Sequence, residues 1–140
     1  MQLAQRLHAE NKGTRYARPL GTLAKEIAED RAALRAIMET LDVKVDPIKV
    51  GVAWASEKAG RLKLNGRLIG YSPLSRLLEL EGLLAGVEGK LGLWRALRVM
   101  APAEPRLDEE SLDELIVRAE RQLGVLREQH GLAAEEALPQ

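Results

Sequence analysis

The stretch YSPLSRLLELEGLLAGVEGKLGLWRALRVM, residues 71–100, decides the fold of this chain. It opens with Ser72 and Pro73, a pair typical of a helix start, because serine caps the first turn and proline has no N–H to leave unpaired there. Beyond Pro73 the apolar residues recur at steps of three and four as far as Met100. This spacing predicts one long α-helix over residues 73–100.

Two uncharged faces run along this predicted helix. The first carries large side chains: Leu77, Leu80, Leu84, Val87, Leu91 and Trp94. The second carries mostly small ones: Leu78, Gly82, Ala85, Gly89, Gly92 and Ala96. Small side chains allow another helix to approach closely, although each interior glycine costs up to ~1 kcal/mol of helix stability. We therefore expect neighbours on both faces, which makes this helix the most enclosed in the fold.

Signals for helix starts and stops divide the rest of the chain. Asp46 and Pro47 form a second start signal, while Asn65 with Gly66, the segment 101–105 and Gly131 interrupt helical patterns. We predict helices at residues 2–12, 20–42, 47–64, 73–100 and 108–130. The Asn-Gly pair, within RLKLNGRLIG at 61–70, is also typical of a β-hairpin. A helix that ends at this pair fits better, because the apolar spacing before it is helical.

Composition limits both the fold and the chemistry. A chain of 140 residues with 46% hydrophobic residues is long enough for one domain, 1–140, with a single core. The 21 basic and 21 acidic residues balance, so no net field draws the chain to nucleic acid or to a membrane. Cysteine is absent, which excludes disulfides and thiolate chemistry and fits a cytoplasmic location. No apolar run reaches the length of a membrane span, and the first residues do not resemble a signal peptide.

Three acidic residues are candidate metal ligands: Asp30, Glu81 and Glu88. Asp30 interrupts the apolar seam of the predicted 20–42 helix, between Ile27 and Leu34. Glu81 and Glu88 fall between the two uncharged faces of the 73–100 helix, so we expect both to point partly inward. Carboxylates that converge inside a helical bundle hold two metal ions in ferritin-like proteins. The pattern therefore raises the hypothesis of a metal site.

Other features of the sequence weigh against that hypothesis. The chain has no Glu-x-x-His pair, and its two histidines, His8 and His130, lie near opposite ends of the sequence. Glu81 and Glu88 are about 10 Å apart along a helix axis, which is too far for both to bind one ion. The alternative is that the three acids pair with lysine or arginine at the margin of the core, and this arrangement is the commoner one.

A group of cationic residues forms the second candidate site. In an up-down bundle the connections near residues 13–19 and 65–72 lie at the same end. They bring Tyr16 and Tyr71 together with six candidates for anion binding: Arg15, Arg18, Arg61, Lys63, Arg67 and Arg76. The opposite end collects six acids: Glu39, Asp42, Asp46, Asp108, Glu109 and Glu110. This polarity complements the helix dipoles, and it is also compatible with binding of RNA or another anionic ligand or with head-to-tail contact between molecules.

Sequence motifs for catalysis or nucleotide binding do not occur. The chain has no GxxxxGK[ST] or GxGxxG loop, and no Ser-His-acid or Cys-His set is suggested. The glycines of the 73–100 helix lie within an apolar helical pattern, where packing explains them better than a ligand does. We expect a protein that is not an enzyme and that has no cofactor.

A resemblance to a known family rests on WASEKAGRLKLNGRLIGYSPLSRLLELEGLLAGVEGKLGLWRAL, residues 54–97. This block is similar to the centre of a family of small, uncharacterised bacterial all-helical proteins, and the similarity extends more weakly to AEDRAALRAIM at 28–38 and to ERQ at 120–122. The resemblance implies a ferritin-like bundle shape and assigns no activity. Members of this type tend to carry a longer first helix with Asp, His and Glu, so the resemblance implies that any site built on that extension would be missing here.

Together these observations predict a single all-α domain, an up-down four-helix bundle of ferritin-like shape with a short helix at its N-terminus. The function expected is that of a non-catalytic structural or interaction module. The first alternative is an atypical ferritin-like metal-binding protein, and the second is anion or nucleic-acid binding through the basic end. Because an 11-residue first helix leaves apolar surface of its longer neighbours open, we also expect a homodimer.

Overall fold

The computed structural model describes residues 2–43 and 71–138 and shows an all-α helical bundle in this part of the chain. Its elements are α1 (Leu3–Glu10), α2 (Ala17–Leu41), α4 (Pro73–Met100), a 3₁₀-helix η1 (Ala101–Ala103) and α5 (Glu109–Ala137). The described residues contain no strand. The predicted helix at 47–64 and the alternative hairpin at 61–70 lie outside the described residues.

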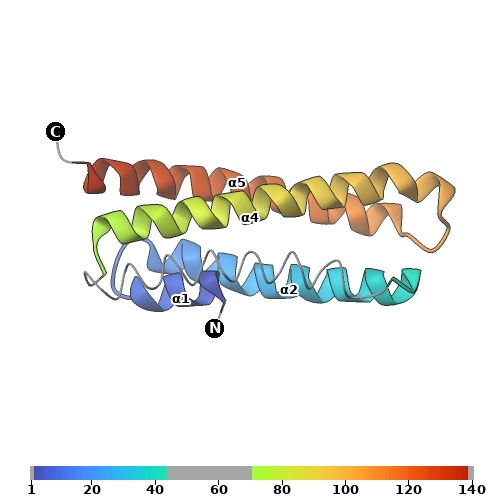
Figure 1. Ribbon diagram of the computed structural model, residues 1–140, viewed down its shortest axis with the longest axis horizontal. Helices are drawn as coiled ribbons and strands as arrows, with labels where there is room; N and C mark the ends of the chain where they lie inside the picture. Colours follow the sequence, from blue (N-terminus) through green and yellow to red (C-terminus); the bar gives the residue numbers. More distant parts are fainter. Residues whose placement is uncertain (1, 44–70, 139–140) are drawn as a thin grey trace.

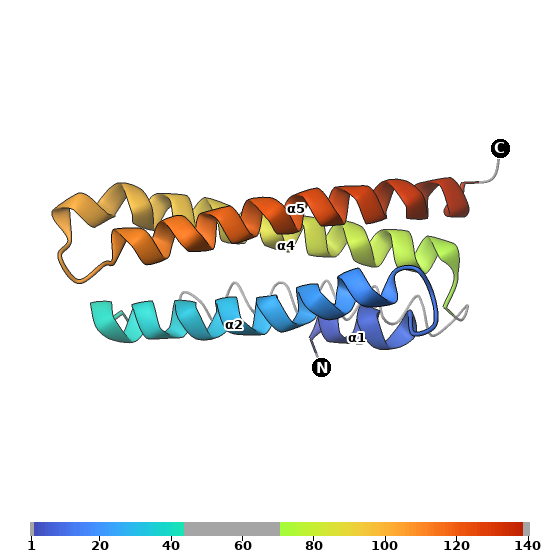
Figure 2. The same ribbon diagram turned by 180° about the vertical axis from the view of Figure 1, so that it is seen from behind.

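The helices form two antiparallel pairs (Figure 1). The α4 and α5 helices lie side by side over most of their length, and α1 folds back along the first part of α2. Seen from behind in Figure 2, the turn between α1 and α2 lies at the same end of the bundle as the start of α4 and the last turn of α5. The end of α2 and the connection between α4 and α5 lie at the opposite end. The expected up-down arrangement is therefore present in the described helices.

Local sequence explains where these helices begin and end. The Ser72 hydroxyl accepts a hydrogen bond from the Ser75 N–H at 3.2 Å, and Pro73 follows as the first helical residue, as predicted. Asp108 caps α5 by accepting from the Glu110 N–H at 3.2 Å. The α2 helix ends at Leu41, and the capping residue Asp42 adopts the left-handed conformation with φ of 54°.

The prediction that Gly131 ends the last helix was wrong, because α5 continues to Ala137. A glycine stops a helix when the backbone turns to positive φ there, and Gly131 does not do so. The extra turns carry Glu135 and Glu136 to the end of the bundle that holds the α1–α2 turn. This extension changes the charge of that end.

The core lies between α4, α5 and the first part of α2. Trp94, Leu80 and Leu126 are at most 1% exposed, and Tyr16 and Leu7 join the same apolar cluster from the α1–α2 pair. The predicted large face of α4 is the buried one, with Leu77, Leu80, Val87, Leu91 and Trp94 all inside. In the described part of the chain, no helix is long and apolar enough to cross a membrane.

Within the described residues, most of the small-residue face of α4 is exposed: Ala85, Gly89, Gly92 and Ala96 are exposed, while Leu78 and Gly82 are half-buried. The neighbour expected on this face is therefore not among the described helices. A Cβ atom added at Gly86, Gly89 or Gly92 would meet no heavy atom within 4 Å. We call this surface the outer face of α4. Its exposed residues are Leu74, Ala85, Gly86, Gly89, Gly92, Leu93, Ala96, Val99 and Met100.

Candidate functional site

The structure places the residues of the two predicted sites in three separate groups. Asp30 lies in the middle of the bundle, Glu81 and Glu88 lie along the contact between α4 and α5, and Arg15 and Arg76 lie at the end that holds the α1–α2 turn. Among the described residues, no group of three histidine, cysteine, aspartate or glutamate side chains could hold a metal ion.

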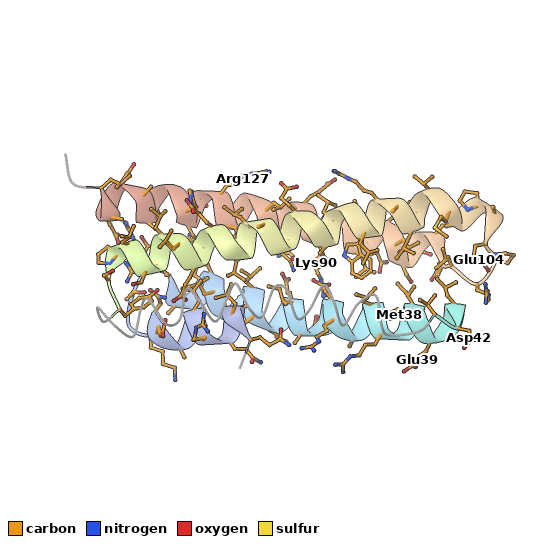
Figure 3. The ribbon with its side chains drawn as sticks, viewed as in Figure 1. Met38, Glu39, Asp42, Lys90, Glu104 and Arg127 are labelled. Carbon is orange, nitrogen blue, oxygen red and sulfur yellow. The ribbon has the colours of Figure 1, made fainter. Side chains whose placement is uncertain are left out.

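Asp30 is buried, as its place in the apolar seam predicted, at 2% exposure. Its Oδ2 atom accepts hydrogen bonds from the Lys90 ammonium at 2.7 Å and from the Gln122 amide at 3.1 Å. The Lys90 ammonium also donates to Oε1 of Gln122 at 2.6 Å, which closes a three-membered network. Figure 3 shows Lys90 on the side of α4 that faces α2. This network joins α2, α4 and α5 inside the bundle.

Two further ion pairs flank the Asp30 network. Arg118 donates to Glu29 at 2.9 Å and to Oδ1 of Asp30 at 3.4 Å. Arg121 donates to Glu26 at 2.7 Å. We call these residues the central network: Glu26, Glu29, Asp30, Lys90, Arg118, Arg121 and Gln122. Its three carboxylates are matched by three cations, so it holds no excess negative charge with which to bind a metal ion.

The prediction that Glu81 and Glu88 point inward was wrong. Their side chains are 54% and 53% exposed, and they contact α5 from the outside of the helix pair. Glu81 lies 3.1 Å from Nε2 of His130, and Glu88 accepts from Arg127 at 2.8 Å. Arg127 projects from α5 at the edge of the bundle in Figure 3.

The spacing of these two glutamates reflects the packing of two helices and not a metal site. Glu81, Glu88 and Arg95 are seven residues apart in succession, and Arg95 contacts Glu120 of α5 at 3.2 Å. Residues at heptad spacing stay beside the seam between two packed helices and form ion pairs across it. The structure thus separates Asp30 from Glu81 and Glu88, and the three do not form the proposed metal set.

The basic end is organised around a buried asparagine. Asn11 is fully buried, and its amide donates to the Leu7 carbonyl at 2.7 Å and to the Tyr71 hydroxyl at 2.8 Å. Its Oδ1 atom accepts from Nε of Arg76 at 2.6 Å. The Arg76 guanidinium lies 4.5 Å from the centre of the Tyr16 ring, within the range of a cation–π interaction. These contacts tie the α1–α2 turn to the start of α4.

A carboxylate from α5 partly neutralises this end. Glu136 accepts from Arg76 at 2.9 Å and also pairs with Arg15, so two of the six predicted cations share one acid. Arg18 is exposed on the first turn of α2. The other three predicted cations, Arg61, Lys63 and Arg67, lie outside the described residues. The contribution of Glu136 was missed because the last helix was expected to end before it.

Glu79 is a further candidate that the sequence pattern did not single out. It is 3% exposed on α4, and its Oε2 atom accepts no hydrogen bond from the described residues. Burial raises the pKa of Glu79 to about 7, the negative charge of Glu10 raises this pKa as well, and Arg6 opposes the shift. A carboxyl group with this pKa exchanges its proton near neutral pH. No sequence signal marks it, because it stands beside the apolar face of an amphipathic helix.

The central network generates a prediction for stability. Lys90→Met removes the closest cation from a carboxylate that is 1% exposed, and should lower the free energy of unfolding by about 3 kcal/mol in urea denaturation. Arg127→Gln breaks a pair whose two side chains are more than half exposed, and should cost about 0.5 kcal/mol or less. Equal losses in the two variants would contradict a structural role for the central network.

The buried Glu79 generates a prediction for pH. Its folded-state pKa of about 7 lies above the value of 4.5 in an unfolded chain, so the native state binds more protons between these values. Stability should therefore fall by up to about 3 kcal/mol as pH rises from 4.5 through 7, and should then level off. Glu79→Gln should flatten this profile, whereas Glu88→Gln should leave it unchanged. A profile that keeps its slope in Glu79→Gln would assign the titration to another group.

Comparisons of this chain with protein-family models, with curated proteins and with solved structures found no match in any of the three.

Proposed function

We propose that this protein is a non-catalytic interaction module that binds a macromolecular partner through the outer face of α4. One observation carries the proposal: a long helix whose inner face is buried leaves its opposite face both apolar and exposed. Val99 is 81% exposed, Met100 53%, Leu74 46% and Leu93 38%. Contiguous apolar surface on a soluble domain is typical of an interaction site.

The positions of the charged residues of α4 support the proposal that its outer face binds a partner. Arg76, Glu79 and Lys90 are directed towards the other helices of the bundle. The other four, Glu81, Glu88, Arg95 and Arg98, pair with residues of α5. These are all the charged residues of α4. Glu81 lies five turns from Val99 and, with Glu88 and Arg95, borders the outer face on the side of α5, so the apolar residues of this face lie beyond that charged edge.

The outer faces of the other long helices differ in this respect. Exposed positions of α2 include Lys25, Arg31 and Arg35, and exposed positions of α5 include Glu120 and Glu128. The outer face of α4 thus stands apart from the charged surfaces around it. A cytoplasmic location is part of this proposal and is supported by the absence of cysteine from the sequence.

Site-specific photocrosslinking tests the proposed function. A photoreactive amino acid at position 96, where Ala96 lies exposed on the outer face of α4, should give a covalent adduct in cells that express the protein. The matched control places the same amino acid at position 128 on α5, where Glu128 is also exposed. We expect an adduct of defined mass from position 96 only. No adduct at position 96, or the same products from both positions, would overturn the proposal.

Anion binding at the basic end is a second candidate, because Arg15 and Arg76 converge from different elements on one carboxylate. Glu136 then competes with an external anion, so Glu136→Gln should tighten binding of a fluorescent single-stranded RNA, and Arg76→Gln should weaken it. Binding should also fall steeply as salt concentration increases. Unchanged affinity in both variants would remove this candidate.

A further inference from the structure

Building on the proposed function, we infer that the outer face of α4 docks onto the same face of a second copy of this chain. The two α4 helices run antiparallel across a two-fold axis that passes close to Gly92. The proposed function requires only some macromolecular partner; this inference names that partner and its orientation.

The chemistry of the face favours a second copy. A partner that covers Leu93, Val99 and Met100 must itself be uncharged over a similar length, because burying an unpaired charge against apolar side chains is costly. Among the described helices, α4 has an exposed face of that kind, while exposed positions of α2 and α5 carry charged side chains. A face that is complementary to itself is also what a two-fold symmetric dimer needs.

The charges at the edge of this face set the orientation. Glu88 and Arg95 lie on one edge of α4, with side chains 53% and 59% exposed. In an antiparallel pair related by a two-fold axis, like edges meet and residues equidistant from the axis face each other. An axis midway between positions 88 and 95 places Glu88 of each copy beside Arg95 of the other. The arrangement therefore forms two reciprocal ion pairs.

The same axis matches large side chains with small ones. It passes between Leu91 and Gly92 and brings Val99 of one copy level with position 84 of the other, within one residue, or about 1.5 Å, of Ala85. Gly89 and Gly92 cost helix stability, and a Cβ atom added at either would meet no heavy atom within 4 Å in one chain, but they allow two helices to approach closely. A second α4 therefore accounts for glycines that packing among the described residues leaves unexplained.

The contact that this axis allows is small. Residues 83–100 of the two α4 helices overlap, a length of about 27 Å, and a strip of roughly 15 Å width along it offers roughly 400 Å² per copy. The total of roughly 800 Å² is below the range for stable protein interfaces and typical of weak, transient ones. We therefore expect a weak dimer that forms at high concentration and dissociates on dilution.

Sedimentation equilibrium of the full chain tests the inference, with charge-swap variants at the edge of the outer face. The native chain should form dimers at hundreds of micromolar and dissociate at lower concentration. Either single swap, Glu88→Arg or Arg95→Glu, replaces both reciprocal ion pairs between the copies by pairs of like charges. Each should weaken association about tenfold or more. The double swap should restore association to within about threefold of the native chain.

Two matched variants separate the contact between copies from contacts within one chain. Glu88 pairs with Arg127, and Arg95 pairs with Glu120, inside the same chain. Arg127→Glu and Glu120→Arg break these internal pairs without changing the outer face, and should leave the dimer unaffected. The double swap at 88 and 95 leaves both internal pairs broken. If the double swap nevertheless restores association, the restoration must come from the ion pairs between the two copies. Circular dichroism should show unchanged helix content in every variant.

Different outcomes contradict this inference and the proposed function. The native chain could prove monomeric while position 96 still gives an adduct whose mass is not twice that of the chain. This result would contradict docking to a second copy but would support the proposed interaction module. A monomeric chain with no adduct would overturn both. A dimer that is insensitive to the single swaps, or that the double swap fails to restore, would overturn the antiparallel arrangement proposed here.

Discussion

The hydrogen-bonded pair of Asp30 and Lys90 is the interaction on which the arrangement of the helices depends. The α4 and α5 helices share an apolar seam, which tolerates sliding by whole turns, but a buried carboxylate tolerates no such shift. Asp30 is satisfied only where Lys90 and Gln122 both reach its Oδ2 atom. This requirement fixes the position of α2 along the other two helices, because an unpaired buried charge costs several kcal/mol. The buried polar group thus specifies the register that apolar packing leaves open.

Pairing of charges inside the bundle also determines the character of its surface. On α4, Lys90 is used by the central network, Arg76 holds the α1–α2 turn, and the acids at heptad spacing bind α5. The helix therefore has strong polar contacts on its sides and inner face. What remains is the outer face, where leucine, valine and methionine alternate with glycine and alanine. Among the described residues, the contacts that stabilise the bundle thus leave this surface exposed.

The fold could be predicted from local signals, whereas the sites depended on helix pairing. Ser72 with Pro73 marked the start of α4, and the apolar spacing around Asp30 correctly placed that acid inside. Glu81 and Glu88 were misjudged because the angle of a residue on one helix does not show where the neighbouring helix lies, and both side chains pair with α5 from outside the core. Glu136 was missed because a glycine was read as a stop although the helix continues through it.

The zero net charge of the chain bears on how the protein could recognise a partner. A molecule that recognises its partner through long-range attraction needs an excess of one charge, as nucleic-acid-binding surfaces have. Here the central network balances its own charges, and the acid Glu136 neutralises part of the basic end. With little field left at a distance, the recognition that we propose acts at short range, through shape and apolar contact at the outer face of α4.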